Sequence, residues 1–360
     1  MPSFLANLYH IEAKAAIFNN DSSLALHLHT KAADIGHPES AYYVGMHSNY
    51  TQTQIKYFTL ASSLNHKLAT FHLAVIYEKG RPGVAVDPGK AFQLYNQCVT
   101  LGHWQAVEYL AGCYERGFGC EKDAAKALKT FEDRQQVLQP WVLYTLGRYY
   151  RDGIGTPGSV KNMGKAVGCF QKAAAVGNPF AHLALAEWYE SSGKQQDLAA
   201  FHYGAAVNVF MQLANKKDEG SSSSLLRLGQ LYSSGKGLVK DDVKAFEFYQ
   251  AAANAGDKIG YFAVGDCYYE GRGCVKDDSL AIQNFKLSAD QGYAKAKYML
   301  GNMYRRGEGI SQDYSKAMIY YQEAAEKEPK AISSIVSMYL NGEGVEKSQE
   351  KADEWLLKLE

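Results

Sequence analysis

The feature that most constrains this chain is a short motif built on tyrosine that recurs about every 36 residues. A Leu-Gly-x-x-Tyr segment, as in Leu300 to Tyr304, is followed by Gly-x-Gly at Gly307 and Gly309. We call the tyrosines at this place the anchor tyrosines: Tyr77, Tyr114, Tyr150, Tyr189, Tyr232, Tyr268, Tyr304 and Tyr339. Such a period predicts a solenoid, in which each repeat is packed only by its neighbours. With two weaker N-terminal copies, we expect about ten repeats in a single domain over residues 1–360.

Each copy predicts a pair of helices. A large aliphatic residue four positions before the anchor tyrosine and a small one eight positions before it share one helix face, as Leu300 and Ala296 do. Three positions before it stands Gly or Ala, for example Gly301. Because Gly costs about 1 kcal/mol in a helix interior relative to Ala, its recurrence predicts a close approach of another helix. The Gly-x-Gly that follows ends this first helix, since Gly can adopt the left-handed conformation.

A second helix follows in each copy. It begins after a side chain that can accept hydrogen bonds from the first amides of the helix. These capping residues are Asp21, Asp87, Asp123, Asn162, Asp241, Asp277, Asp313 and Ser348. An alanine stands four positions after each cap, a bulky residue such as Tyr321 usually stands four positions later, and Gly256 is typical of the glycines that stop the helix.

Together these motifs resemble the Sel-one-like repeat (SLR) family, an α-solenoid relative of the tetratricopeptide repeats. The resemblance rests on Leu-Gly-x-x-Tyr-x-x-Gly-x-Gly and the Lys-Ala-x-x-x-Tyr/Phe of the second helix, as in Leu228 to Gly256, and it covers essentially the whole chain. It implies an all-α fold, a right-handed α-solenoid (superhelix) of helix-turn-helix repeats. Most members of the family are adaptors for other proteins, although the fold alone identifies no partner.

Three places depart from the repeat. The irregular second repeat, near residues 40–70, lacks the Gly-x-Gly loop and has Ser48 in the place of the anchor tyrosine. Residues 216–224 predict a flexible insertion loop, because Gly/Ser-rich segments bury little apolar surface; a loop that contacts a partner or is phosphorylated is the alternative. Residues 349–360 alternate charge with Trp355 and Leu356 and predict a capping helix with one docked face.

Composition excludes several classes of function. The 38 Lys and Arg residues balance 38 Asp and Glu residues, so no net charge attracts nucleic acid or an anionic membrane. The first residues resemble no signal peptide, and no apolar run is long enough to span a membrane. We therefore expect a cytoplasmic protein with no nucleic-acid and no membrane partner.

The segments that most resemble catalytic, cofactor or metal motifs are parts of the repeat itself. The segment from Gly83 to Lys90 has the wrong spacing for a phosphate-binding loop, and no His-Glu-x-x-His is present. Ser348 and Lys351 match the Ser-x-x-Lys of penicillin-recognising enzymes, yet Ser348 already holds a capping position. We expect no catalytic residue, no metal and no cofactor.

Four of the six cysteines form two pairs with the same spacing, Cys113 with Cys120 and Cys267 with Cys274. Other repeats have mostly apolar residues there, so we interpret these cysteines as small hydrophobic residues with reduced thiols. A disulfide within each pair is the alternative. Secreted SLR proteins associated with β-lactam hydrolysis have cysteines in nearly every repeat, a pattern that this sequence lacks.

The residues that packing does not dictate are the most informative for function. The positions five before, two before, and one and two after the anchor tyrosine share one face of the first helix, and they differ between copies. In the tetratricopeptide relatives the first helices line a concave surface, which implies a groove that carries Tyr and Arg, types enriched at interaction hot spots. The candidate partner-binding residues are Tyr109, Glu115, Arg116, Arg148, Arg151, Asp266, Tyr269, Asn302, Arg305 and Arg306. A merely solvated helix face is the alternative.

These observations predict a non-enzymatic adaptor or scaffold that holds a protein or peptide along the concave face. An acidic segment is the favoured ligand, because Arg can bind a carboxylate through two hydrogen bonds. Two alternatives belong to other classes: an SLR-type hydrolase or small-molecule binder of the penicillin-binding kind, and a structural module that self-assembles by end-to-end stacking.

Overall fold

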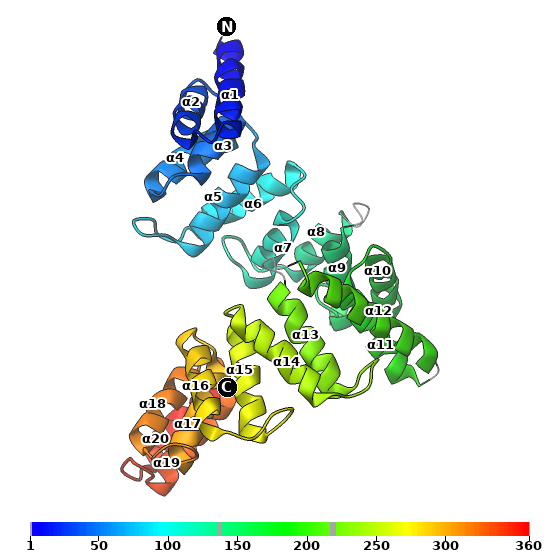
Figure 1. The fold of residues 1–360 in the computed structure, drawn as a ribbon, viewed down its shortest axis with the longest axis vertical. Helices are drawn as coiled ribbons and strands as arrows, with labels where there is room; N and C mark the ends of the chain where they lie inside the picture. Colours follow the sequence, from blue (N-terminus) through cyan, green and yellow to red (C-terminus); the bar gives the residue numbers. More distant parts are fainter. Residues whose placement is uncertain (1, 135–138, 194, 217–220, 360) are drawn as a thin grey trace. The chain divides into compact units, whose positions relative to one another are not determined.

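The chain forms α-helices throughout the part that the structure describes (Figure 1). This computed structural model describes residues 2–134, 139–193, 195–216 and 221–359. Within these ranges the only β contact is an isolated bridge between Arg81 and Val84. Contacts along the chain separate two compact units, Met1–Ala181 and His182–Glu360.

The helices follow one another in pairs, and we call the odd-numbered member the first helix and the even-numbered member the second helix. The first unit contains α1 (Pro2–Phe18), α2 (Ser22–Asp34), α3 (Pro38–Met46), α4 (Thr51–Ser63), α5 (Lys67–Lys79), α6 (Pro88–Thr100), α7 (Ala106–Arg116), α8 (Ala124–Glu132), α9 (Pro140–Asp152) and α10 (Met163–Ala175). The boundary between the units falls within α11 (Pro179–Ser192). The second unit continues with α12 (Gln196–Ala214), α13 (Ser221–Ser234), α14 (Asp242–Asn254), α15 (Lys258–Glu270), α16 (Asp278–Asp290), α17 (Ala294–Arg306), α18 (Tyr314–Ala324), α19 (Pro329–Asn341) and α20 (Gln349–Leu356).

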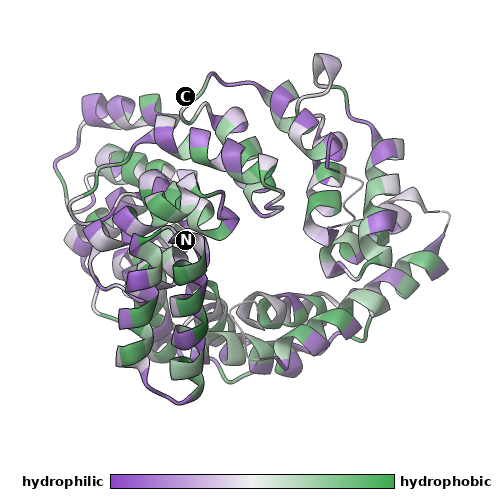
Figure 2. Ribbon diagram, turned by 90° about the horizontal axis from the view of Figure 1, so that it is seen from above, coloured by the Kyte–Doolittle hydropathy of each residue, from purple (hydrophilic) through white to green (hydrophobic). Residues whose placement is uncertain are grey.

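Neighbouring helices pack in sequence order. In the second unit α13 packs on α14, and α14 packs on α15. Individual helices carry hydrophobic and hydrophilic residues on different faces (Figure 2), and the small and aliphatic positions of the repeat, such as Ala296 and Leu300, are fully buried. The all-α fold of paired helices that the repeat predicts is therefore confirmed. The division into about ten repeats of a single domain stays a prediction.

The second helices begin where the sequence predicts. Each capping side chain accepts a hydrogen bond from the backbone N–H three residues later, as Asp277 does from Leu280 at 2.9 Å. This bond satisfies an amide that the helix itself leaves without a partner, and it is worth about 1 kcal/mol. All eight predicted caps act in this way: Asp21, Asp87, Asp123, Asn162, Asp241, Asp277, Asp313 and Ser348.

Each Gly-x-Gly loop fixes one helix pair against the preceding one. Gly273 lies in the loop after α15 with φ +72°, and a Cβ added there would come within 2.0 Å of the carbonyl oxygen of Asp242, the first residue of α14. Gly119 stands in the same relation to Pro88, the first residue of α6. The second glycine is therefore required by a close backbone approach between successive pairs.

The prediction of an insertion loop at 216–224 is wrong for the last four of these residues. Ser221 to Ser224 form the first turn of α13, and Ser224 is 2% exposed. Ser224 stands eight positions before anchor Tyr232, which is the place of the small buried residue in the repeat, so packing overrides the flexible composition. Residues 217–220 lie outside the described residues.

The predicted capping helix at 349–360 is shorter than expected. α20 ends at Leu356, and a single turn of 3-10 helix covers Leu357–Leu359. Ala352 is buried and Trp355 packs on the last core cluster, whereas Leu356 is 44% exposed because the next position lies about 100° further around the helix. Residue 360 lies outside the described residues.

The second repeat has the predicted irregularity. α3 ends at Met46 and α4 begins at Thr51, so a four-residue connection replaces the Gly-x-Gly loop. None of the helices in the described part of the chain is long and apolar enough to cross a membrane.

Candidate functional site

Several candidate residues on the first-helix face contact the neighbouring repeat. The Arg116 guanidinium on α7 lies 3.3 Å from the Glu78 carboxylate on α5. The Tyr149 hydroxyl on α9 donates to the Glu115 carboxylate on α7 at 2.8 Å. Some of the charged and hydrogen-bonding side chains on this face thus hold one repeat against the next.

In the second unit these contacts follow a rule. The residue after one anchor tyrosine meets the middle residue of the next Gly-x-Gly loop, and we call this a cross-pair contact. The three examples are Glu190 with Lys236 at 3.7 Å, Tyr269 with Glu308 at 2.8 Å, and Arg305 with Glu343 at 2.6 Å. Arg305 holds the pKa of the Glu343 carboxyl below its usual range by hydrogen bonding.

The other candidate residues have different surroundings. Tyr109 packs its ring between Phe71 and Tyr95, with centroid distances of 5.1 Å to each. Asn302 accepts a hydrogen bond from the Tyr321 hydroxyl at 2.8 Å. The structure therefore gives Tyr109 and Asn302 a packing role, and their role in binding stays a prediction.

Three candidate arginines stand at the surface. Arg151 donates two hydrogen bonds to the adjacent Asp152, at 2.8 and 3.0 Å. The Arg306 guanidinium lies 3.5 Å from Glu308, and the Arg148 side chain is exposed. The predicted groove is therefore not a continuous row of unpaired arginines, and a partner would have to compete with carboxylates of the protein itself at Arg151 and Arg306.

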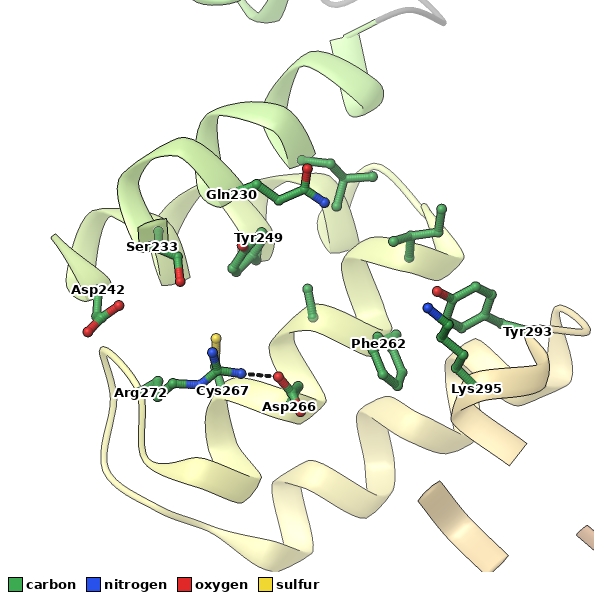
Figure 3. Close-up of a pocket in the computed structure, with 14 residues that line it drawn as sticks. Gln230, Ser233, Asp242, Tyr249, Phe262, Asp266, Cys267, Arg272, Tyr293 and Lys295 are labelled. Carbon is green, nitrogen blue, oxygen red and sulfur yellow. Dashed lines mark hydrogen bonds and ion pairs between the residues drawn. The ribbon is translucent and has the colours of Figure 1, made fainter. Parts of the chain in front are cut away.

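The tenth candidate, Asp266, lies in a cavity of about 260 Å³ in the second unit (Figure 3). First-helix positions of α13 and α15 form two of its walls, including Gln230, Ser233 and Asp266. The loop residue Arg272 extends beneath Tyr249 of α14, and its guanidinium is paired with Asp266 (Figure 3). Phe262, Tyr293 and Lys295 close the far end.

Burial sets the protonation of the groups in this cavity. It raises the pKa of the Asp266 carboxyl in spite of the opposing charge of Arg272. It also raises the pKa of the Tyr249 hydroxyl to about 12 and that of the Cys267 thiol to about 12. Both groups thus keep their protons near neutral pH, whereas an activated nucleophile needs a lowered pKa or an adjacent base. The arrangement suits hydrogen bonding and ion pairing with a ligand.

The cysteines differ in how far they are buried. All six cysteines are free, and Cys113 and Cys267 are buried. Cys120 and Cys274 are only partly buried, so the interpretation of all four as small hydrophobic residues needs correction for these two loop positions. In the described ranges no three His, Cys, Asp or Glu side chains are placed to hold a metal ion.

Sequence reasoning found Asp266 but missed the rest of the cavity. Gln230 and Ser233 occupy the same variable positions as the chosen candidates, two before and one after anchor Tyr232. The available signal was the type of residue after the anchor tyrosine: three other repeats have a glutamate there, Glu78, Glu115 and Glu190, where this repeat has Ser233.

The paired helices, the caps and the glycine loops define an α-helical repeat protein. A family model described as the Sel1 repeat matches residues 17–37, 67–103, 104–129, 143–178, 222–257, 259–293, 294–328 and 334–359. These segments make up more than half of the chain, so it belongs to the Sel1 repeat family. The resemblance stated from the sequence is confirmed.

Two curated relatives are named as regulators. The chain is 31% identical over 136 residues to chitin synthase regulatory factor 1 of Schizosaccharomyces pombe, a match over 35% of this chain and 29% of that protein. It is 26% identical over 196 residues to the chitin synthase regulator SKT5 of Saccharomyces cerevisiae, over 53% of this chain and 27% of that protein. The matched part is thus less than a third of each relative.

Similar solved structures include two bacterial Sel1-repeat proteins. One is c5321 of uropathogenic Escherichia coli, a protective antigen with an SLR fold, at 25% identity and a TM-score of 0.46, covering 84% of this chain and 63% of that one. The other is a Sel1 repeat protein of Oxalobacter formigenes, at 24% identity and a TM-score of 0.49, covering 88% of this chain and 89% of that one.

Proposed function

We propose that this protein is a non-enzymatic adaptor that binds a segment of a partner protein along the exposed face of its first helices. The observation that carries the proposal is the cavity between α13 and α15, which opens on this face and presents Gln230, Ser233 and Arg272. Membership of the Sel1 repeat family and the regulator names of the two relatives support a role in protein interaction. Those names make a chitin synthase the first partner to test.

The alternative of an SLR-type hydrolase or small-molecule binder has less support. The cavity of about 260 Å³ is smaller than the roughly 300–1,000 Å³ of small-molecule sites. Ser348, the serine of the Ser-x-x-Lys segment considered above, accepts a hydrogen bond from the Lys351 backbone as a helix cap.

The proposal is tested by photo-cross-linking at two positions of the second unit. A photoreactive amino acid replaces Gln230 on the first-helix face, and in a matched control it replaces the exposed Glu247 on α14. We expect a partner protein to become attached through position 230 and not through position 247. Attachment only through position 247 would contradict binding on the first-helix face.

Self-association is a second candidate, favoured by the apolar outer face of α1. Phe4, Ile11 and Phe18 lie on one side of this helix and are 74%, 63% and 88% exposed. Contiguous exposed apolar surface often marks an interaction site. Sedimentation velocity of the chain and of a Phe4→Ser/Phe18→Ser variant separates the two functions, because only a self-assembling module loses its larger species in the variant.

A further inference from the structure

One cross-pair contact in the second unit is interrupted. Glu190 follows anchor Tyr189 and pairs with Lys236 in the next loop, and the equivalent residues one repeat later are Ser233 and Arg272. A serine is too short to reach the guanidinium as the glutamate reaches Lys236. The cavity lies at this place, with Ser233 and Arg272 both in its wall.

Because the carboxylate is missing from the neighbouring repeat, Arg272 pairs within its own helix pair, with Asp266. Arg presents five N–H donors, and the hydrogen bond to Asp266 comes from one of the guanidinium nitrogens. The Tyr249 hydroxyl, which interacts with the Ser233 hydroxyl, lines the same side of the cavity. The cavity therefore gathers donors around a place that a carboxylate occupies in the preceding repeat.

The surrounding charges leave this place open to an anion. Asp242 pairs with Lys240 at 3.1 Å, so its charge is balanced within the protein. Lys295 is exposed at the far end of the cavity, with no ion pair to any residue in the described part of the chain. A carboxylate that enters at Ser233 would share the Arg272 guanidinium with Asp266, and Lys295 adds a positive charge at the far end of the cavity.

The cavity also limits the size and polarity of what can enter. Its volume of about 260 Å³ suits one side chain. Phe262, Ile259 and Tyr293 form an apolar wall beside the polar one, so the ligand carries apolar groups next to its carboxylate. A single acidic residue in a peptide with apolar neighbours has this chemistry.

We propose that the cavity at Ser233 and Arg272 binds a carboxylate of the partner protein, which completes the interrupted cross-pair contact from outside. The proposal rests on the proposed adaptor function and names the chemistry of its ligand. The carboxylate is supplied by an Asp or Glu side chain or by a chain terminus.

The test is a selection of random 12-residue peptides on the full chain. One library displays a free C-terminus and the other embeds the peptide between fixed flanks, so the source of the carboxylate is read from the library that is enriched. Dissociation constants are then measured for the selected peptides and for their Asp→Asn, Glu→Gln or amidated forms.

Three variants assign the binding to the cavity. Ser233→Glu supplies the missing carboxylate from within, and Arg272→Gln removes the charge that would receive it. Ser234→Glu is the matched control, because it changes the charge equally at an exposed neighbour that does not line the cavity.

We expect the selected peptides to share one fixed carboxylate, and its neutralisation to weaken binding at least tenfold. Ser233→Glu and Arg272→Gln weaken binding to the same extent, Ser234→Glu does not, and Ser233→Glu melts no lower than wild type. Failure to select peptides, peptides without a fixed carboxylate, or unchanged binding by Ser233→Glu would overturn the proposal. A partner that cross-links through position 230 without needing an acid would retain the adaptor function and remove only the carboxylate site.

Discussion

The backbone of Gly301 lies directly against the ring of Tyr321, so that an added Cβ would come within 2.5 Å of the Cε1 atom of that ring. The same relation joins Gly229 to Tyr249 at 2.4 Å and Gly147 to Phe170 at 2.5 Å. The close approach that the recurring glycine predicts is therefore confirmed, and its partner is the bulky residue of the second helix in the same repeat.

We predict that Gly301→Val destabilises the protein by about 2 to 4 kcal/mol, because the β-branched side chain must displace a fully buried ring. Gly204→Ala is the matched control, since a Cβ added there meets no atom within 4 Å and Ala favours a helix by about 1 kcal/mol. Chemical denaturation should show a loss for the first variant and no loss for the second. Equal stabilities of Gly301→Val and wild type would contradict the packing explanation.

Local sequence signals were sufficient to predict the helices, but they were insufficient to predict the surface contacts between repeats. The caps and Gly301 act within one repeat, so the spacing of residues in the sequence predicts them. The pairing of Arg305 with Glu343 depends on how two repeats are stacked, and it joins residues 38 positions apart. Ser224 is a different case, because its burial follows from its spacing to the anchor tyrosine, whereas the loop was predicted from the composition around it.

The cross-pair contact between Arg305 and Glu343 is expected to stabilise the second unit. The Arg305 and Glu343 side chains are only 24% and 26% exposed, and Arg305 also donates to the Ser337 hydroxyl at 3.0 Å. We predict that Arg305→Ala lowers stability by roughly 1 to 3 kcal/mol. The exposed Arg148→Ala should change it by less than about 0.5 kcal/mol.

Such a loss would show that Arg305, a candidate binding residue, also contributes to stability. A double-mutant cycle with Glu343→Gln isolates the pair, because the two substitutions should be non-additive if the contact is real in solution. Additive losses of free energy would show that Arg305 stabilises the helix in some other way.

The two thiols of each cysteine pair should react at different rates. Burial raises the pKa of Cys113 to about 11, and the same cause raises the pKa of the partly exposed Cys120. Access then decides the order, so Cys120 and Cys274 should be alkylated in the native protein before Cys113 and Cys267. Peptide mass spectrometry over a time course checks the order; simultaneous modification of all four would indicate unfolding as the common step.

Acid should destabilise the first unit through a cluster of histidines on α1 to α3. His10 and His29 both place Nδ1 3.0 Å from the Ser40 hydroxyl, and the ring of His10 stacks on His37 with centroids 4.0 Å apart. Burial, reinforced by neighbouring His residues and Lys14, lowers the pKa of His10 and of His29 from 6.5 to about 4. Both rings are therefore neutral in the folded protein at pH values where the unfolded chain is already protonated.

The sign of the effect follows from linkage. A group whose pKa is lower in the folded state contributes fully to the stability of the fold above its unfolded pKa. That stability is lost as the pH falls toward the folded pKa. Stability should therefore fall between about pH 6.5 and pH 4.

Thermal unfolding of wild type and of the His10→Asn/His29→Asn variant across this pH range checks the predicted loss of stability. We expect the variant to melt lower at pH 7 but to lose less on acidification, because Asn keeps a polar group near Ser40 and does not titrate; equal losses in both proteins would assign the acid sensitivity to other groups.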